Sequence, residues 1–407
     1  MSTDAKPLRL MFVAGETSGD HHAAAAIAAL RAADPQVQCF GLGGPAMQAA
    51  GMRLDLDLAS RSVIGFIEVL KHFSYFRHAF ALAESLLREQ KPDLLVLVDY
   101  PGFNLRLAKK AKALGIPVAY YISPQVWAWK RGRVKTMARL LRKMLVTFPF
   151  EKALYQEAGL DCALVGNPLL DAIPAELLWK RAEDPDDARQ RSLRAEAGLS
   201  PEGPLVGLLP GSREQEVKWL LPVMLQAAEL AAILRPDWRF VVVKLPAAPP
   251  QWYQAVKEAR DRGLAVTLFE SGDNAKAYAL RAACDTALVA SGTATLETAL
   301  LGVPFAILYR VHPLTYFIGK RLVKIHSIGL ANVVAGRRVV PEFLQEGLDP
   351  VAISAEMLAL ASQPQRRQDQ RQGLAEGLAG LGQPGVAGRV AQELLGLAQE
   401  SRARAAA

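Results

Sequence analysis

The sequence is poor in the residues that build metal sites and disulfides. Its 407 residues include three cysteines, Cys39, Cys162 and Cys284, which lie far apart and form no Cys-x-x-Cys pair. Each lies in or beside a stretch that predicts a strand, so we expect buried, reduced thiols. The six histidines include the pair His21-His22, but none has the i, i+4 spacing of a helical metal site. The sequence therefore predicts no metal ion and no other cofactor.

Long apolar runs are also missing. The longest purely aliphatic stretches are as short as Leu94–Val98, whereas a spanning helix needs about 20 apolar residues. The apolar stretch near the N-terminus turns polar at Gly15-Glu16, too early for the core of a signal peptide. With 51% hydrophobic and 22% charged residues, the composition indicates large buried cores and excludes disorder. We expect a cytoplasmic protein without a membrane span.

Several nucleotide and hydrolase motifs are absent. The turn after the first predicted strand is not a Gly-x-Gly-x-x-Gly fingerprint, and no P-loop or Gly-x-Ser-x-Gly elbow occurs, which argues against dinucleotide binding, ATPase activity and serine hydrolase activity. An Asp-x-Asp pair, Asp55-Leu-Asp57, can signal a metal-dependent sugar transferase. Here it lies in an alternating Leu-Asp pattern that is typical of an edge strand, so we do not assign a metal to it.

Positive charge is in excess and is unevenly spread. The net charge is +8, and the run Lys130–Lys143 holds seven basic residues and no acidic one. Such a helix attracts phosphates, nucleic acid or an anionic lipid surface, or is simply a solvated face. No nucleic-acid-binding motif accompanies it, so we expect no nucleic acid partner.

The chain alternates short apolar runs with helical patterns, and this alternation stops and restarts once. Continuously hydrophobic strands of this kind indicate parallel sheets covered on both faces. We expect an α/β protein with two doubly wound, Rossmann-like domains over 1–180 and 181–350, and C-terminal helices over 351–407. The acidic stretch Ala182–Asp187 marks the linker region. The predicted strands are Leu8–Ala14, Val37–Gly41, Leu94–Asp99, Val118–Ile122, Met144–Phe148, Ala163–Val165, Leu205–Leu209, Phe240–Leu245, Val266–Phe269, Thr286–Ala290 and Phe305–Tyr309. Ligands of paired doubly wound sheets bind at the strand C-termini, in the cleft between the domains.

Polar residues follow three strands of the first domain. Glu16 and Ser18 lie in the first turn, where Glu16 is placed for substrate contact and Ser18 or Asp20 for capping the helix. Asp99 ends the strand before Asn104, and partial burial there would raise its pKa and suit it to general-base work. The alternative is that Asp99 caps the next helix.

A third turn, Ile122–Lys130, holds Gln125 and two tryptophans, among them Trp127. Aromatic faces stack on sugars, although the same residues can simply anchor a loop.

Two strand–turn–helix units of the second domain predict phosphate binding. Gly211, Ser212 and Arg213 precede one helix, and Ser291, Gly292 and Thr293 precede another. Helix N-termini attract phosphate, and an arginine adds a fixed fork of donors. Glu297 could accept from a ribose diol. Two such turns in one domain favour a nucleotide diphosphate.

From the residues alone, the interpretation is a nucleotide-sugar enzyme. A transferase with a non-lipid acceptor and a UDP-sugar 2-epimerase both remain open at this point. A two-lobed binding module would show the same paired lobes, but such modules are usually exported.

The ordered set of motifs is similar to that of the lipid-A-disaccharide synthase family. The motifs that carry the resemblance run from residue 8 to about 345: Ala14–Asp20, Gly43–Met47, Ile64–Leu70, Ser123–Trp129, Pro149–Glu151, Leu209–Arg213, Ala290–Glu297 and Lys320–Lys324. The chain departs from the family pattern at Gly102, Ala331 and the His21-His22 pair.

The resemblance implies an inverting, metal-independent transferase of the two-domain GT-B type. It would move a 2,3-diacylglucosamine from UDP to the 6-hydroxyl of 2,3-diacylglucosamine 1-phosphate. The family's essential aspartate and arginine fall on Asp99 and Arg213, and its nucleotide contacts fall on Ser291–Glu297 and near Asn332. The C-terminal helices would return to the first domain, and a homodimer could exchange them.

Both implied substrates carry acyl chains, so we expect peripheral association with the inner membrane. The aromatic and aliphatic segment Val63–Phe80, with its interspersed basic residues, is the expected contact, unless Phe73 and Phe76 pack inside the first domain.

Overall fold

The chain forms two compact units, each with its own parallel sheet. The computed structural model describes residues 6–60, 73–129, 132–179, 187–244, 248–270, 272–312, 316 and 327–406. Unit 1 consists of Met1–Asp171 with Leu381–Ala407, and unit 2 consists of Ala172–Gly380.

Unit 1 contains a seven-stranded parallel sheet in the order β3-β2-β1-β4-β5-β6-β7. Its central strands are buried on both faces, which explains their unbroken runs of aliphatic residues. The strand order reverses between β1 and β4, where Ala14 pairs in register with Val98. The strands are β1 (Arg9–Ala14), β2 (Gln38–Gly43), β3 (Arg53–Asp57), β4 (Leu94–Val98), β5 (Val118–Tyr121), β6 (Lys143–Val146) and β7 (Cys162–Leu164).

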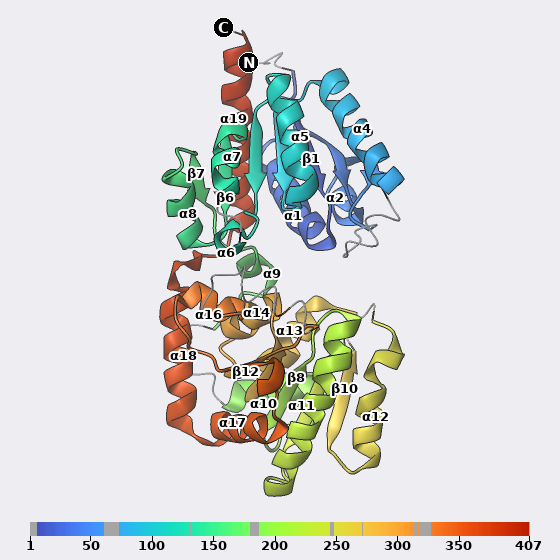
Figure 1. Ribbon diagram of the computed structural model, residues 1–407, viewed down its shortest axis with the longest axis vertical. Helices are drawn as coiled ribbons and strands as arrows, with labels where there is room; N and C mark the ends of the chain where they lie inside the picture. The colour runs from blue at the N-terminus through green and yellow to red at the C-terminus, as the bar shows by residue number, and fades with distance from the viewer. Residues whose placement is uncertain are drawn as a thin grey trace. The chain divides into compact units, whose positions relative to one another are not determined.

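Helices cover both faces of this sheet (Figure 1). The described helices of residues 6–172 are α1 (Thr17–Ala33), α2 (Pro45–Ala49), α4 (Phe73–Gln90), α5 (Pro101–Ala113), α6 (Val126–Trp129), α7 (Arg133–Leu140), α8 (Pro149–Gln156) and α9 (Leu169–Ala172). Apolar side chains of α4, α5, α7 and α8 fill one core with the strands, and the buried Cys162 belongs to it.

Unit 2 contains a six-stranded parallel sheet in the order β10-β9-β8-β11-β12-β13. The order reverses between β8 and β11, where Leu209 pairs in register with Val289. The strands are β8 (Leu205–Leu209), β9 (Arg239–Lys244), β10 (Val266–Glu270), β11 (Thr286–Ala290), β12 (Phe305–Tyr309) and β13 (Glu342–Leu344). The helices are α10 (Asp187–Glu196), α11 (Glu214–Leu234), the 3₁₀ helix η1 (Pro250–Tyr253), α12 (Gln254–Asp261), α13 (Asn274–Ala282), α14 (Thr293–Leu300), α16 (Leu330–Ala335), the 3₁₀ helix η2 (Gln345–Gly347), α17 (Pro350–Ser362) and α18 (Pro364–Leu378).

Helix α11 is long and apolar enough to cross a membrane by length and composition. Its buried residues, including Val217, Leu221 and Met224, belong to the core of unit 2, where the helix contacts α17 and the sheet. These contacts account for its apolar composition as that of a core helix.

The C-terminal helices divide between the two units. Helices α17 and α18 contact α11 and α16 and belong to unit 2, whereas the 3₁₀ helix η3 (Ala379–Leu381) leads into α19 (Val386–Ala406), which packs against α1 of unit 1 (Figure 1). The sequence assigned all of 351–407 to the returning segment. The difference arises because Ile353, Met357 and Leu360 of α17 complete the core of unit 2, and because Gln370 of α18 bonds to the main chain of Phe305.

Polar contacts fix α19 at both ends. The Asp171 carboxylate accepts hydrogen bonds from the main-chain amides of Gly385, Val386 and Ala387 at the start of the helix. Near its end, the Arg402 guanidinium pairs with Asp93 at 2.6 Å. These contacts explain why the last helix stays with the first sheet.

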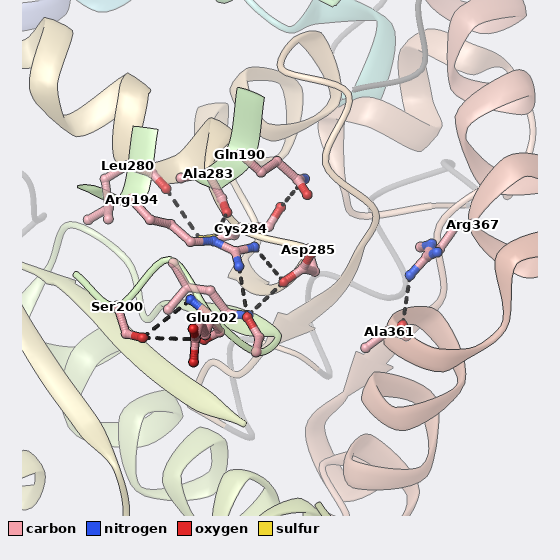
Figure 2. A network of polar contacts seen from close by, with 12 residues as sticks. Gln190, Arg194, Ser200, Glu202, Leu280, Ala283, Cys284, Asp285, Ala361 and Arg367 are labelled. Atoms are coloured by element: carbon pink, nitrogen blue, oxygen red, sulfur yellow. Dashed lines mark hydrogen bonds and ion pairs between the residues drawn. The ribbon is translucent and has the colours of Figure 1, made fainter. Parts of the chain in front are cut away.

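One buried arginine attaches α10 to the rest of unit 2 (Figure 2). The Arg194 side chain is 5% exposed and donates to the carbonyls of Ala283 and Gly203 at 2.9 and 2.8 Å, and to the carboxylate of Asp285 at 2.7 Å. Gln190, one turn earlier, donates to the Cys284 carbonyl at 3.2 Å. Elsewhere in the same view, Arg367 donates to the carbonyl of Ala361. Because a buried charge needs this many partners, the network positions α10 firmly on the end of α13.

The predicted fold class is confirmed, since both sheets are parallel and doubly wound and the last helix packs on the first unit. The expected linker, Ala182–Asp187, lies almost wholly outside the described residues. The predicted edge position of Asp55-Leu-Asp57 is confirmed, because β3 ends the sheet of unit 1.

Candidate functional site

Two carboxyl groups meet where the strand order of unit 1 reverses. Glu16 follows β1 and Asp99 follows β4, and these strands are neighbours in the sheet. Burial, and then the negative charge of Glu16, raise the pKa of the Asp99 carboxyl to about 6. An adjacent pair of strand ends of this kind is where ligands of doubly wound folds bind.

The main chain at Asp99 is held in an unusual conformation. Asp99 and Tyr100 are both left-handed, with φ of 45° and 48°, which costs on the order of 1–3 kcal/mol each. The Asn104 amide donates to the Asp99 carbonyl at 2.7 Å, and the Tyr120 hydroxyl donates to the same oxygen. These bonds compensate the strain. Tyr100, and not Asp99, occupies the N-cap of α5, so the alternative that Asp99 caps this helix is wrong.

The turns after β1 and β4 are packed against each other. A Cβ atom on Gly15 would lie 2.2 Å from Cδ1 of the Tyr100 ring, so only glycine fits beneath this ring. Tyr100 was not among the predicted site residues. Its ring couples the position of Glu16 to that of Asp99.

The remaining residues of the first turn have separate roles. Ser18 lies exposed in the first turn of α1, and Glu16, at the N-cap, makes no side-chain capping bond. Asp20 is buried and does not cap its own helix, because its carboxylate accepts from the amides of Gly44, Ala46 and Met47 at the start of α2. Asp20 therefore stabilises a neighbouring turn.

Asn104 was predicted to contact the acceptor, but its side chain is fully buried. It donates to the carbonyls of Val98 and Asp99 and so lies behind the turn. Gln125 is exposed, and Trp127 is half-buried with its ring edge-on to Phe150 at a centroid distance of 5.3 Å.

The predicted phosphate-binding turns of unit 2 line one pocket of about 300 Å³. Its walls include every predicted nucleotide residue except Asn332, together with two charged residues that the sequence did not single out, Glu216 and Arg281. The pocket lies where β8 and β11 end, at the reversal of the strand order.

Glu216 already occupies the amides of the first turn. Its carboxylate accepts from the main-chain N–H groups of Ser212 and Arg213 at 2.9 and 3.2 Å, and from the Arg213 guanidinium at 3.2 Å. The carboxylate also lies where a Cβ on Gly211 would be, at 2.4 Å. A glutamate three residues after the N-cap is the signature of a capping box, and it could have been found in the sequence. The Arg213 side chain is 63% exposed and lines the pocket.

In the second turn, the main-chain amides at the start of the helix face the pocket. Ser291 is used internally, because its amide donates to Leu308 and its hydroxyl donates to the Ile328 carbonyl at 3.1 Å. Gly292 and Thr293 line the pocket at the start of α14, where first-turn amides have no partner within the helix. A Cβ on Gly292 would meet open space, so the main chain itself faces the pocket.

Glu297 is held by two neighbours on α13. Arg281 forms an ion pair with its carboxylate, and the Tyr278 hydroxyl donates to it at 3.2 Å. Arg281 was missed because nothing in the local sequence distinguishes it from an ordinary surface arginine of a helix. It brings a second cation to the pocket beside Arg213.

Asn332 lies outside this pocket. Its amide donates to Val340 and Glu342, and its carbonyl oxygen accepts from the amides of Val339 and Val340, all within 2.8–2.9 Å. The side chain is 1% exposed, so it stabilises the segment after α16.

Within the described part of the chain, no group of three or more His, Cys, Asp or Glu side chains could hold a metal ion. Asp55 pairs with Arg53 at 3.1 Å, and Asp57 accepts from the amide of Ser60. The Asp-x-Asp pair thus has structural partners.

Comparisons with known proteins agree on one family. The model of the family described as lipid-A-disaccharide synthetase matches residues 10–387. The chain is 41% identical over 399 residues to the lipid-A-disaccharide synthase of Geobacter metallireducens, covering 97% of this chain and 98% of that protein. It is 41% identical over 396 residues to the one of Myxococcus xanthus, covering 97% and 99%.

Solved structures with similar folds are more distant in sequence. The UDP-GlcNAc 2-epimerase from Neisseria meningitidis bound to UDP-GlcNAc aligns with a TM-score of 0.62 at 13% identity, over 97% of this chain and 100% of that one. A calicheamicin glycosyltransferase aligns with a TM-score of 0.56 at 16% identity, over 97% and 98%. At these identities the likeness concerns the fold.

Proposed function

The chain belongs to the lipid-A-disaccharide synthase family, and from this premise we propose that it joins UDP-2,3-diacylglucosamine to 2,3-diacylglucosamine 1-phosphate. As a member of the family it is a glycosyltransferase of lipid A biosynthesis, with lipid A precursors as substrates. The bond formed runs from the anomeric carbon of the donor to the 6-hydroxyl of the acceptor, and UDP leaves.

The epimerase alternative that the residues left open receives less support. The epimerase from Neisseria meningitidis shares 13% of its aligned residues with this chain, against 41% for the synthase of Geobacter metallireducens. A shared fold carries many activities, so the sequence match decides between them.

Asp99 is the proposed general base. In an inverting transfer, the acceptor hydroxyl attacks the anomeric carbon from the face opposite the UDP, and its proton must be removed as the bond forms. A partly buried carboxyl with a pKa of about 6 is ionised at neutral pH and is still basic enough to accept that proton. The single observation that carries the assignment is the position of this carboxyl, on a strained turn at the reversal of the strand order.

The proposed donor site is the pocket of unit 2. The diphosphate would bind to the amides of Gly292 and Thr293 at the start of α14 and to Arg213, because Glu216 occupies the amides of the other turn. Negative charge builds on the β-phosphate as the glycosidic bond breaks, so donors aimed there stabilise the transition state. Glu297, oriented by Arg281, is placed to accept from the ribose.

The acceptor side keeps Glu16, Ser18, Gln125 and Trp127 as proposed contacts. Asn104 moves from this group to a positioning role, because its buried amide holds the Asp99 carbonyl. Asn332 likewise moves from the proposed nucleotide contacts to a positioning role, in which it supports the end of α16.

Two further expectations remain proposals. Association with the inner membrane is supported by the acylated precursors of the family. Most of the expected segment Val63–Phe80 lies outside the described residues, while Phe76 and Phe80 pack partly against the core of unit 1. The second of these proposals is a homodimer, and a sizing measurement at two protein concentrations would test it.

The direct test is an assay with both precursors in detergent. Product analysis should find a β-1,6-linked disaccharide 1-phosphate and one UDP released per product, with a rate unchanged by EDTA. Release of UDP without disaccharide, or a UDP-sugar epimerised at C2, would refute the proposal.

A further inference from the structure

Helix α13 places a tyrosine and an arginine against Glu297. Tyr278 and Arg281 are three residues apart, so they lie on the same face of the helix. The guanidinium carbon of Arg281 lies over the Tyr278 ring, 5.6 Å from its centroid, so the two side chains pack as a pair. None of the predicted site residues lies on α13, and the proposed reaction gives Tyr278 no role.

The two oxygens of the Glu297 carboxylate have different donors. The Tyr278 hydroxyl donates to Oε1 at 3.2 Å, and Nη1 of Arg281 donates to Oε2. One donor on each oxygen fixes both the position and the plane of the carboxylate. A carboxylate oxygen can accept about two hydrogen bonds, so each oxygen can accept one more from a ligand.

This ion pair belongs to the wall of the pocket in unit 2. Arg281 and Glu297 both line the pocket, and their side chains are only 14% and 16% exposed. Hydrogen bonds to a charged group in such surroundings are stronger than in water. Glu297 lies one turn after Thr293, about 6 Å further along the axis of α14. A ribose attached to a diphosphate at the start of α14 would therefore lie beside the carboxylate.

The helix that carries the pair is fixed at both ends. The Asp273 carboxylate caps its start by accepting from an amide of the first turn at 2.8 Å. Beyond its end, the buried Arg194 donates to the carbonyl of Ala283 at 2.9 Å (Figure 2). Leu280, which lies between the tyrosine and the arginine, is fully buried. The helix thus presents the two side chains from a well-anchored position.

We propose that Tyr278 and Arg281 are positioning residues, which hold the Glu297 carboxylate for the two ribose hydroxyls and make the pocket selective for ribonucleotides. The inference rests on the proposed function, because it concerns the proposed UDP site. A nucleotide without these hydroxyls leaves the carboxylate without its ligand donors, and an acceptor left unpaired in a pocket is penalised.

A direct contact between Arg281 and the diphosphate makes a different prediction. It would strengthen the binding of every nucleoside diphosphate by the same factor, whether or not the sugar carries hydroxyls. Positioning through Glu297 strengthens only the binding of nucleotides that carry them. The ratio of two dissociation constants therefore separates the two roles, and it needs no catalytic activity.

The experiment measures the Kd for UDP and for 2′,3′-dideoxy-UDP by calorimetry. In the wild type the dideoxy compound should bind at least about 10-fold more weakly. The ratio of the two Kd values should fall several-fold in E297Q and R281M, and should also fall in Y278F. Because both ligands carry the same charge, the ratio cancels the general effect of a lost cation. Y278F should leave the Kd for the dideoxy compound within about twofold of the wild-type value, since this ligand makes no use of Glu297.

The double variant R281M/E297Q tests whether Arg281 acts through Glu297. Its ratio should equal that of E297Q alone, because the two residues then act on the ribose as one unit. The matched control is K276M, which removes a cation from an exposed position of the same helix and should leave the ratio unchanged.

Three outcomes would overturn the inference: a wild-type ratio near one, a ratio in R281M equal to that of the wild type, or a further fall when R281M is added to E297Q. In each case the wild type still binds UDP and forms the disaccharide, so the proposed function stands. A wild type that neither binds UDP nor forms the disaccharide would instead show that the proposed function fails.

Discussion

At the scale of single residues, the Asp99 carboxyl derives its chemistry from its surroundings. Burial alone raises its pKa, and the neighbouring Glu16 raises it further. Two carboxyl groups on adjacent strand ends cannot both ionise as easily as one, and this keeps Asp99 basic. The same proximity predicts how the rate should depend on pH.

Replacing Glu16 by Gln should move the acidic limb of the pH–rate profile to lower pH. The base must be ionised, so wild-type kcat should fall below a pH of about 6 and retain roughly a quarter of its maximum at pH 5.5. Removing the negative charge of Glu16 lowers the pKa of Asp99, so E16Q should retain a clearly larger fraction of its own maximum at pH 5.5. The control is E157Q, the same substitution at an exposed glutamate outside the proposed site. An acidic limb that stays in place would show that Glu16 does not act on Asp99.

The residues that the sequence identified at strand ends do lie at strand ends, because a continuous aliphatic run determines where a buried strand stops. Their individual contacts could not be predicted. Asn104 and Asn332 are buried and bond to groups five to ten residues away, which no local pattern indicates. The Ser291 hydroxyl donates to the carbonyl of Ile328, a partner distant in the chain. Only the helix cap formed by Glu216 could be predicted from the neighbouring residues in the sequence.

At the scale of elements, two turns act as one unit because Tyr100 lies on Gly15. G15A should therefore displace the Tyr100 ring and the left-handed turn that carries Asp99, since the new Cβ would lie 2.2 Å from the ring. We expect a loss of kcat on the order of 10-fold to 100-fold, because small misplacements of a catalytic group are costly.

The double variant G15A/Y100A tests the cause of this loss. Removing the ring creates room for the methyl group, so activity should recover toward that of Y100A alone. If the double variant is no more active than G15A, the loss does not come from contact with Tyr100.

The attachment of α10 to the rest of unit 2 should depend on Arg194. R194M keeps an unbranched side chain but removes the guanidinium that donates to the Asp285 carboxylate and to two carbonyls, and leaves the amide of Leu205 as a donor to Asp285. Breaking a buried pair in this way should lower the free energy of unfolding of unit 2 by about 3–5 kcal/mol. Urea unfolding measures it, with R191M, at an exposed position of the same helix, as the control. Equal midpoints for the two variants would contradict the account.

Most elements were predictable because strands such as β8, β11 and β12 are short, aliphatic and bounded by turn residues. Strand β13 has no counterpart among the predicted strands. A strand of three residues, Glu342–Leu344, has no periodicity of its own and exists because β12 offers it an edge.

At the scale of the whole molecule, the sequence indicated two domains but misplaced the final boundary. A helical pattern does not say which core an apolar face completes, and α17 and α18 complete the second. The return of α19 depends on Asp171 and Asp93, which are remote from it in the chain.

Membrane association should depend on the segment before α4. F66S/I67S should weaken binding to vesicles of anionic lipid, and raised salt should weaken binding further, because each basic residue near the surface contributes about 1 kcal/mol. F76S is the contrasting control, since Phe76 packs partly against the core and its loss should lower the Tm. Undiminished vesicle binding by F66S/I67S would assign the contact elsewhere.

The most direct test of the account compares the turnover of D99N with that of the wild type. Asparagine tolerates the left-handed φ of this position, so the turn should survive the substitution. Because burial raises the pKa of Asp99, ionising it above a pH of about 6 disfavours the folded state. D99N should therefore be more stable than the wild type at pH 8, by on the order of 1–3 kcal/mol, and this gain should shrink as the pH falls toward 4.

The measurement is kcat for disaccharide formation together with the Kd for UDP, in both proteins at pH 8. With Asp99 as the base, D99N should lose roughly 10²–10⁴-fold in kcat while its Kd for UDP stays within about twofold. Turnover close to that of the wild type, with the product still formed, would contradict the central claim.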